Sequence, residues 1–200
     1  MLKEKEKELK RPIYLISDEP YRELVYGDIK VPYLPNYYDD TIVSYSFSKS
    51  LSLPGERIGY AFVSPKMSTF REVYQAVCGA ARALGFVCAP SLMQKLVPAC
   101  LGKTADTSIY DRNRKLLYSE LTACGYECTP PDGAFYMFVK AFCEDAAEFC
   151  EAAKKHELLL VPSDSFGVTG YVRISYCVTT EQIERALPAF RALAEDFGRI

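Results

Sequence analysis

Tryptophan is absent from this sequence of 200 residues, and histidine occurs only once, at His156. The net charge is −2, so the chain lacks the basic surface field that nucleic-acid binding requires. No apolar run approaches the ~20 residues that a membrane-spanning helix needs. The charged residues 1–8 contain no apolar segment of the kind found in a signal peptide. We therefore expect a cytoplasmic protein that binds neither nucleic acid nor membrane.

Closely paired cysteines are also lacking, although the chain has eight cysteines. None belongs to a Cys-x-x-Cys pair, and Cys124 with Cys128 would need distant partners to bind zinc. We therefore expect no metal site, and free thiols that are mostly buried. His156 follows two lysines in a polar helix end, so a Cys/His nucleophile pair is not expected either.

The hydrophobic fraction of 49% is enough for a sizeable core, and 200 residues suit one domain or a domain and a half. Apolar periodicity predicts helices over residues 2–10, 67–84, from Pro90 onward, 104–124, 142–155 and 180–197. Short apolar runs predict strands over residues 13–16, 41–47, 57–63, 125–128, 134–139, 158–161 and 171–176. Together these elements predict an α/β fold followed by an α+β block from about residue 120.

Three details of these elements are specific enough to check. The strand 13–16 is nearly all apolar, which is typical of a strand buried on both faces of a parallel sheet. In the helix 104–124 we expect the polar run 111–115 to face solvent. We expect Thr180 to cap the last helix.

The chain is organised around residues 44–60, where a polar turn joins two predicted strands. Lys49 in this turn is a primary amine next to apolar residues, where desolvation favours a nucleophilic amine. Arg57 is a permanent cation that suits a phosphate. Ser46, Ser48 and Ser50 supply hydroxyl groups. A lysine that forms a Schiff base, beside a phosphate-binding arginine and serines, meets the requirements of pyridoxal 5′-phosphate (PLP). Taken alone, Lys49 reads more simply as a solvated turn residue.

Two further charged residues follow or lie within predicted strands. Asp18 follows the strand 13–16, at the position where open α/β sheets place groups that contact ligands. A turn or helix cap is an equally good interpretation of Asp18 alone. Arg173 lies inside the apolar strand 171–176, where it must be paired or extended toward solvent. On its own, this pattern slightly favours a structural salt bridge.

The pattern Ser46-x-x-Lys49, seven residues, then Arg57-x-Gly59 closely resembles the lysine segment of class I/II aminotransferases. These are fold-type-I PLP enzymes of the aspartate aminotransferase superfamily. The resemblance continues at residues 18–21, Asp-Glu-Pro-Tyr, and at Arg173.

The resemblance implies a role for each matching residue. Lys49 would form a Schiff base with PLP and move protons, and Asp18 would pair with the pyridine nitrogen. Tyr21 would donate to the phenolic oxygen, Ser46 and Arg57 would hold the phosphate, and Arg173 would bind the substrate carboxylate. Glu19 has no role beyond a charge at a helix start.

The resemblance also implies a domain organisation. Residues 1–119 would form part of the large PLP-binding domain, with its mostly parallel sheet and connecting helix, and residues 120–200 the small α+β domain. The resemblance covers only the C-terminal half of the family's chain. We therefore expect the chain alone to be free of PLP and nearly inactive. We also expect it to form a homodimer or to associate with a missing N-terminal half.

Three functions remain open at this point. The first is an aminotransferase that moves an amino group between an amino acid and a 2-oxo acid. The second is a PLP-dependent C–S lyase or synthase of the same fold. The third is a non-catalytic fragment that acts as an interaction module.

Overall fold

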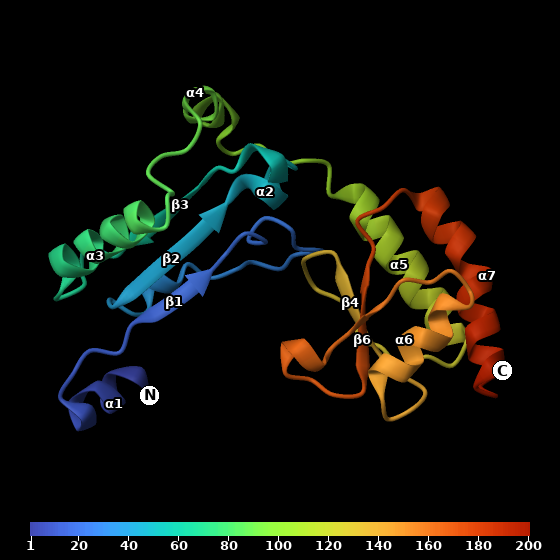
Figure 1. The fold of residues 1–200 in the computed structure, drawn as a ribbon. Coiled ribbons are helices and arrows are strands. Elements are labelled where there is room, and N and C mark those ends of the chain that lie inside the picture. Colours follow the sequence, from blue (N-terminus) through green and yellow to red (C-terminus); the bar gives the residue numbers. More distant parts are fainter. The chain divides into compact units, whose positions relative to one another are not determined.

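The computed structural model describes all 200 residues, and its contacts divide the chain into two compact units (Figure 1). The first unit is Met1–Ala105 and the second is Asp106–Ile200. The domain boundary at residues 119 and 120 stays a prediction, because it refers to the family's domains and not to this division of contacts. No helix of the structure is long and apolar enough to cross a membrane.

The first unit is built on a three-stranded sheet with the order β1-β2-β3. Its elements are α1 (Leu2–Leu9), β1 (Leu15–Asp18), β2 (Thr41–Ser46), α2 (Phe47–Ser50), β3 (Gly59–Val63), α3 (Phe70–Ala83) and α4 (Ser91–Cys100). Strands β1 and β2 are parallel, and β3 runs antiparallel to β2. Helix α2 continues directly from the end of β2 (Figure 1). The sheet thus combines one parallel pair with one antiparallel strand.

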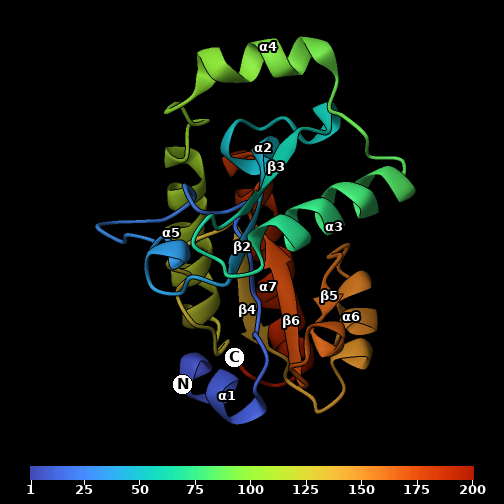
Figure 2. The same cartoon turned by 90° about the vertical axis from the view of Figure 1, so that its left-hand side faces the viewer.

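The core of this unit lies between the sheet and helix α4. Tyr45 and Phe47 pack with Ile58 and with Met93 and Val97 of α4. Helix α3 contacts β3 (Figure 2), but none of its residues is buried. Its apolar stripe is therefore only half-buried in this chain, and Tyr74 is exposed.

Strand β1 differs from its prediction in burial. Ile16 is 69% exposed and Tyr14 is 40% exposed. The strand was expected to be buried on both faces, and this prediction is wrong for the chain by itself. The physical reason is that β1 is an edge strand, with a neighbour on only one side.

The second unit has an antiparallel sheet with the order β4-β6-β5. Its elements are α5 (Ser108–Ala123), β4 (Tyr136–Lys140), α6 (Ala146–Lys154), β5 (Val161–Pro162), β6 (Tyr171–Ser175) and α7 (Thr180–Asp196). Helices α5 and α7 pack against each other (Figure 1). The fully buried core includes Leu117, Met137, Phe149, Tyr176 and Leu193. This unit contains the segment predicted as an α+β block, preceded by most of helix α5, and the predicted α/β class is confirmed.

Two predicted strands of this unit need correction. Residues 125–128 form no strand, and only an isolated bridge joins Cys128 to Val139. The strand predicted over 158–161 is displaced to Val161–Pro162, where it pairs with β6. Both segments are short apolar runs, whose pairing depends on a partner strand rather than on local sequence.

The cap of helix α7 is Thr179 and not Thr180. The Thr179 side chain accepts a hydrogen bond from the Gln182 amide, and the Gln182 side chain accepts one from the Thr179 amide, forming a capping box. The Thr180 hydroxyl donates instead to Oδ1 of Asn113, at 2.9 Å.

Asn113 overturns the prediction that residues 111–115 all face solvent. It is completely buried, and its Nδ2 donates to the carbonyls of Tyr176 and Val178 at 3.1 and 2.7 Å. Asn113 therefore connects α5 through hydrogen bonds to the segment between β6 and α7.

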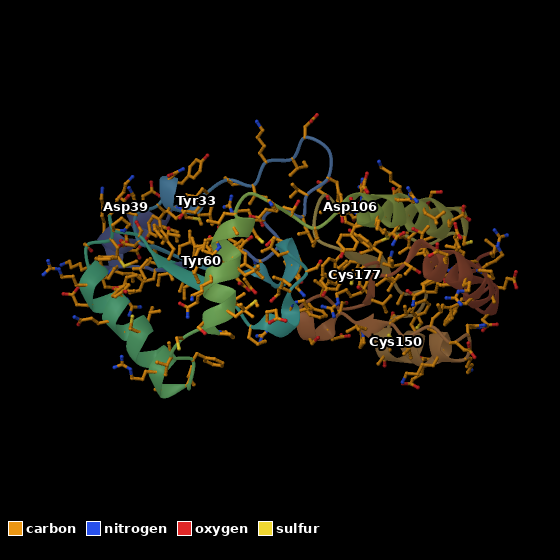
Figure 3. The ribbon with its side chains drawn as sticks, turned by 90° about the horizontal axis from the view of Figure 1, so that it is seen from above. Tyr33, Asp39, Tyr60, Asp106, Cys150 and Cys177 are labelled. Atoms are coloured by element: carbon orange, nitrogen blue, oxygen red, sulfur yellow. The ribbon has the colours of Figure 1, made fainter.

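All eight cysteines are free thiols, as predicted. The prediction that most are buried is wrong, because only Cys124 and Cys150 are buried. Cys78, Cys88 and Cys177 are exposed, and Figure 3 labels Cys150 and Cys177 in the second unit. Cysteine packs as a small apolar residue only where a helix or strand turns it inward, and its spacing in the sequence does not show this.

Candidate functional site

Strands β1 and β2 bring Asp18 and Lys49 to the same end of the sheet, the end formed by the carboxyl termini of these strands. The two strands are parallel, with Asp18 opposite Ser44, so their carboxyl ends lie side by side. Asp18 is the last residue of β1, and Lys49 lies in helix α2 directly after β2. A carboxylate and a primary amine therefore both lie at the carboxyl ends of parallel strands, which is where open α/β sheets bind ligands.

Lys49 lies above the ring of Tyr21. Its Nζ is 5.8 Å from the ring centroid, and both residues are half-buried. At this separation the negative face of the ring attracts an ammonium group. Tyr21 follows Asp18 by three residues, so the turn after β1 carries two of the predicted site residues.

Ser46 ends β2 and caps the short helix α2. Its Oγ accepts a hydrogen bond from the amide of Ser48 at 3.2 Å and lies 2.7 Å from the Ser48 hydroxyl. The two hydroxyls thus form a small polar cluster at the start of the helix that carries Lys49. Ser50 is buried and receives a hydrogen bond from the Tyr45 hydroxyl.

Arg57 lies beside this cluster in the left-handed backbone region, with φ of 50°. It is exposed, and its Nη1 donates to the carbonyl of Pro54 at 2.8 Å. The adjacent Phe47 amide donates to the Ile58 carbonyl, which draws the Arg57 turn toward the end of β2. Arg57 therefore keeps guanidinium donors available for an anion near Ser46.

Gly59 explains why the motif ends in glycine. A Cβ at this position would lie 2.3 Å from the carbonyl oxygen of Tyr45. No side chain fits at that distance, so the close approach of β3 to β2 requires glycine.

Asp18 is exposed, and no residue of the chain forms a hydrogen bond or ion pair with its carboxylate. A turn or helix cap would use the carboxylate as an acceptor for a backbone amide. The structure shows no such bond, so this carboxylate is available to an external donor.

A pocket of about 340 Å³ adjoins Asp18 and Tyr21. Its lining also includes Glu19 and Arg22, whose side chains pair, and Val31 and Pro32 from the following loop. Sequence reasoning left Glu19 without a role. The only signal in the sequence is its position next to Asp18.

Arg173 lies in the second unit, on β6, between two aromatic rings. Its guanidinium carbon is 4.4 Å from the ring centroid of Tyr136 and 4.5 Å from that of Phe166. It forms no ion pair with a carboxylate of this chain, so the structural salt bridge considered for it is absent. Its approach to Lys49 stays a prediction.

The cysteines and the histidine form no alternative catalytic site. Burial raises the pKa of the Cys128, Cys143 and Cys150 thiols, which keeps them protonated at neutral pH. His156 pairs with Asp196, with 2.7 Å between Nε2 and Oδ2. No group of three potential metal ligands occurs in the chain.

Known proteins resemble both the sequence and the fold. The family described as aminotransferase class I and II matches residues 5–190. The crystal structure of an amino transferase from Eubacterium rectale superposes with a TM-score of 0.94 and 56% identity, covering 98% of this chain and 49% of that one. Two relatives are each 30% identical to this chain over 187 residues, and the match covers 88% of this chain and 47% of each relative's length. They are an aspartate aminotransferase from Pyrococcus abyssi and an aromatic-amino-acid aminotransferase from Thermococcus litoralis.

The chain thus spans about half the length of the curated relatives that it matches. The family match covers most of the chain, and the fold agrees with solved members over nearly its full length. The predicted resemblance is confirmed: this chain belongs to the class I and II aminotransferase family.

Proposed function

We propose that this chain carries the catalytic lysine of a PLP-dependent aminotransferase, which moves an amino group between an amino acid and a 2-oxo acid. The observation that supports this most directly is that Lys49 lies over the Tyr21 ring, and that Lys49 and Asp18 both lie at the carboxyl ends of the parallel strands. Relatives of equal identity are named for different amino acids. The donor amino acid is therefore left open.

The donor and acceptor groups at this edge fit PLP. The free carboxylate of Asp18 would hold the protonated pyridine nitrogen, and the Tyr21 hydroxyl would donate to the phenolic oxygen. Ser46 and Arg57 would hold the phosphate, which suits a hydroxyl and a guanidinium. When bound, PLP supplies an electron sink that makes the substrate α-proton removable.

Lys49 has two roles in this proposal: its Nζ attaches the cofactor, and it then carries a proton to and from the substrate carbon. Proton transfer requires an amine held close to the substrate carbon, and the half-buried position of Lys49 restricts where its amine can lie. Arg173 would orient the substrate through a bidentate contact with its carboxylate. The two flanking rings would hold the guanidinium plane in one orientation for that contact.

Because the chain covers about half of its relatives, we propose that the active form contains the remaining part of the family's fold. A homodimer and an association with a separate polypeptide are both compatible with this proposal. The exposed Ile16 on β1 and the half-buried apolar stripe of α3, with its exposed Tyr74, supply surface for such an association.

The test is a fusion protein. This chain is joined to the portion of the Eubacterium rectale amino transferase that it does not cover. We expect the fusion to take up PLP, to show the visible absorption of a PLP imine, and to transfer amino groups only when a 2-oxo acid is present. Lys49→Ala should abolish both signals, and Lys66→Ala, at an exposed lysine after β3, should leave them unchanged.

Three outcomes would contradict the proposal. Normal turnover in Lys49→Ala would remove Lys49 from the mechanism. Turnover of an amino acid without a 2-oxo acid would indicate a lyase instead of an aminotransferase. A fusion that folds but takes up no PLP would favour a non-catalytic module.

A further inference from the structure

Glu19 is a buried carboxylate inside the turn that carries Asp18 and Tyr21. Its side chain is only 7% exposed, whereas Asp18 beside it is exposed. Burying a carboxylate is costly unless it is paired and hydrogen-bonded. The contacts of Glu19 therefore indicate what the chain gains from this residue.

The first set of contacts fixes the backbone on both sides of Asp18. On the preceding side, the Ser17 hydroxyl donates to Oε1 of Glu19 at 2.8 Å. On the following side, the Glu19 amide donates to the carbonyl of Ser44 in β2 at 2.8 Å. Asp18 thus lies between Ser17, which the Glu19 side chain holds, and the Glu19 backbone, which β2 holds.

The second set of contacts runs through Arg22. Its Nε donates to Oε2 of Glu19 at 2.5 Å, while Nη1 and Nη2 donate to the carbonyls of Val31 and Pro32 at 3.0 and 2.8 Å. The guanidinium also lies 5.4 Å from the ring centroid of Tyr33, which Figure 3 labels in the first unit. The hydrogen bond to Glu19 raises the pKa of Arg22, so the cation is permanent.

These contacts join the turn after β1 to a loop that is nine to ten positions further along the chain. The joined segments line the pocket of about 340 Å³ that also contains Asp18 and Tyr21. A planar guanidinium with fixed donors can hold one carboxylate and two carbonyls together, which an ammonium group cannot do.

We propose that the Glu19–Arg22 pair is a positioning element that sets Asp18 and Tyr21 for the cofactor and holds Val31 and Pro32 as the wall of the pocket. The role assigned to this pair rests on the proposed function, and its structure rests on the contacts of Glu19 and Arg22 described above. Glu19 and Arg22 act through Asp18 and Tyr21 and need not touch the cofactor.

The first test uses hydrogen exchange in the 200-residue chain without any cofactor. We expect Glu19→Gln to speed exchange about tenfold over residues 17–24 and 31–34, because the side-chain contacts of Glu19 with Ser17 and Arg22 weaken. Arg22→Lys should speed exchange mainly at 31–34, because lysine keeps the positive charge but lacks the planar guanidinium that donates to Val31 and Pro32. Asp111→Asn is the matched control, since Asp111 pairs with Arg114 at the same spacing in the second unit. It should leave both segments unchanged.

The second test measures PLP in the fusion protein described above. Glu19→Gln should weaken PLP binding about tenfold and shift the pH at which the visible absorption of bound PLP changes, because Asp18 is no longer fixed. Arg22→Lys should give a smaller change of the same kind. If the pair had only a structural role, Glu19→Gln would lower the stability of the protein and leave this pH profile unchanged.

The outcomes separate the two proposals. Unchanged exchange at 17–24 in Glu19→Gln would overturn the positioning element. Faster exchange with an unchanged PLP affinity and pH profile would also overturn it, because the turn would then not govern the cofactor. If the parent fusion takes up no PLP, the proposed function fails. In that case only the hydrogen-exchange measurement tests the pair. Faster exchange at both segments in Glu19→Gln would support the pair as the element that fixes this turn.

Discussion

The Nζ of Lys49 lies 5.8 Å from the centroid of the Tyr21 ring, although the two residues are 28 positions apart. The ring and the hydroxyl of Tyr21 can act separately in this arrangement. The face of the ring can attract a cationic nitrogen, a contact worth about 0.5–1 kcal/mol at a partly exposed site. The hydroxyl is the proposed donor to the cofactor.

Substitutions at Tyr21 should separate these two contributions. We expect Tyr21→Phe in the fusion protein to weaken PLP binding severalfold while keeping the ring beside Lys49. Tyr21→Leu should weaken binding further, because it removes the ring contact with Lys49 as well as the hydroxyl, and titration of each variant with PLP would measure the affinities. Equal affinities for the two variants would show that the ring does not influence Lys49.

Arg173 should act on substrate binding more than on turnover. Arg173→Ala in the fusion protein is expected to raise KM for the amino acid about tenfold or more, with a smaller fall in kcat. Arg173→Lys should fall between, because an ammonium group cannot form the bidentate contact. Arg185→Ala, at an exposed arginine of α7, serves as the control. Steady-state kinetics with a series of amino acids would measure the effect, and an unchanged KM in Arg173→Ala would argue against substrate contact.

Gly59→Ala should destabilise the first unit. The added Cβ would lie 2.3 Å from the Tyr45 carbonyl oxygen, so β2 and β3 must separate locally. We expect a loss of about 1–3 kcal/mol in the free energy of unfolding, as for other overpacked sites. Gly55→Ala is the matched control, because nothing lies within 4 Å of a Cβ there. Urea unfolding of the 200-residue chain would measure both, and equal stabilities would contradict the close approach.

The attachment of helix α1 should depend on pH. No residue of α1 is buried, so its packing relies on polar contacts. Glu6 accepts a hydrogen bond from the Ile13 amide at 3.0 Å and lies within hydrogen-bonding range of Asp40. Oδ1 of Asp40 is buried without a hydrogen-bond partner. Burial, followed by the contact with Glu6, raises the pKa of Asp40, whereas the Ile13 amide and then Tyr38 lower that of Glu6.

The sign of this dependence follows from linkage. A raised pKa means that the packed state binds the Asp40 proton more tightly, so packing weakens as pH rises from 3.8 through the raised value. The lowered pKa of Glu6 has the opposite effect, and its contribution is complete above 4.5. Hydrogen exchange in residues 2–9, corrected for intrinsic rates, should therefore be slowest in mild acid and faster near neutral pH. Asp40→Asn should remove this dependence, and Asp39→Asn, at the half-exposed partner of Lys3, should preserve it.

Asn113 should be important for the stability of the second unit. Asn113→Ala would leave the buried carbonyl of Tyr176 and its neighbour at Val178 without their donor. Each unsatisfied buried group costs about 1–3 kcal/mol, so we expect the unfolding free energy to fall by roughly 3 kcal/mol. Arg112→Ala, at the exposed neighbouring position, should change stability by less than about 0.5 kcal/mol. Similar values for the two variants would show that the Asn113 contacts contribute little.

The sequence alone determined the class of the fold, the order of the main helices and strands, and the family. It did so because Lys49, Arg57 and Gly59 occur at fixed spacing within one continuous segment, and local spacing is visible in a sequence. Gly59 shows the physical basis of this, since only glycine fits against the Tyr45 carbonyl. The candidate site residues themselves rest on the resemblance and stay a prediction.

The tertiary structure decided which polar residues are buried and what they hold. Asn113 sits in a charged run and looks solvated, yet it is completely buried because the segment after β6 supplies two carbonyls and Thr180 supplies a hydroxyl. Glu19 looks like a surface charge, yet it is buried because Arg22 and Ser17 neutralise and hydrogen-bond it. The partners of Asn113 are distant in the chain, and only folding brings them together. The partners of Glu19 are close in sequence, but the fold must orient their side chains toward it.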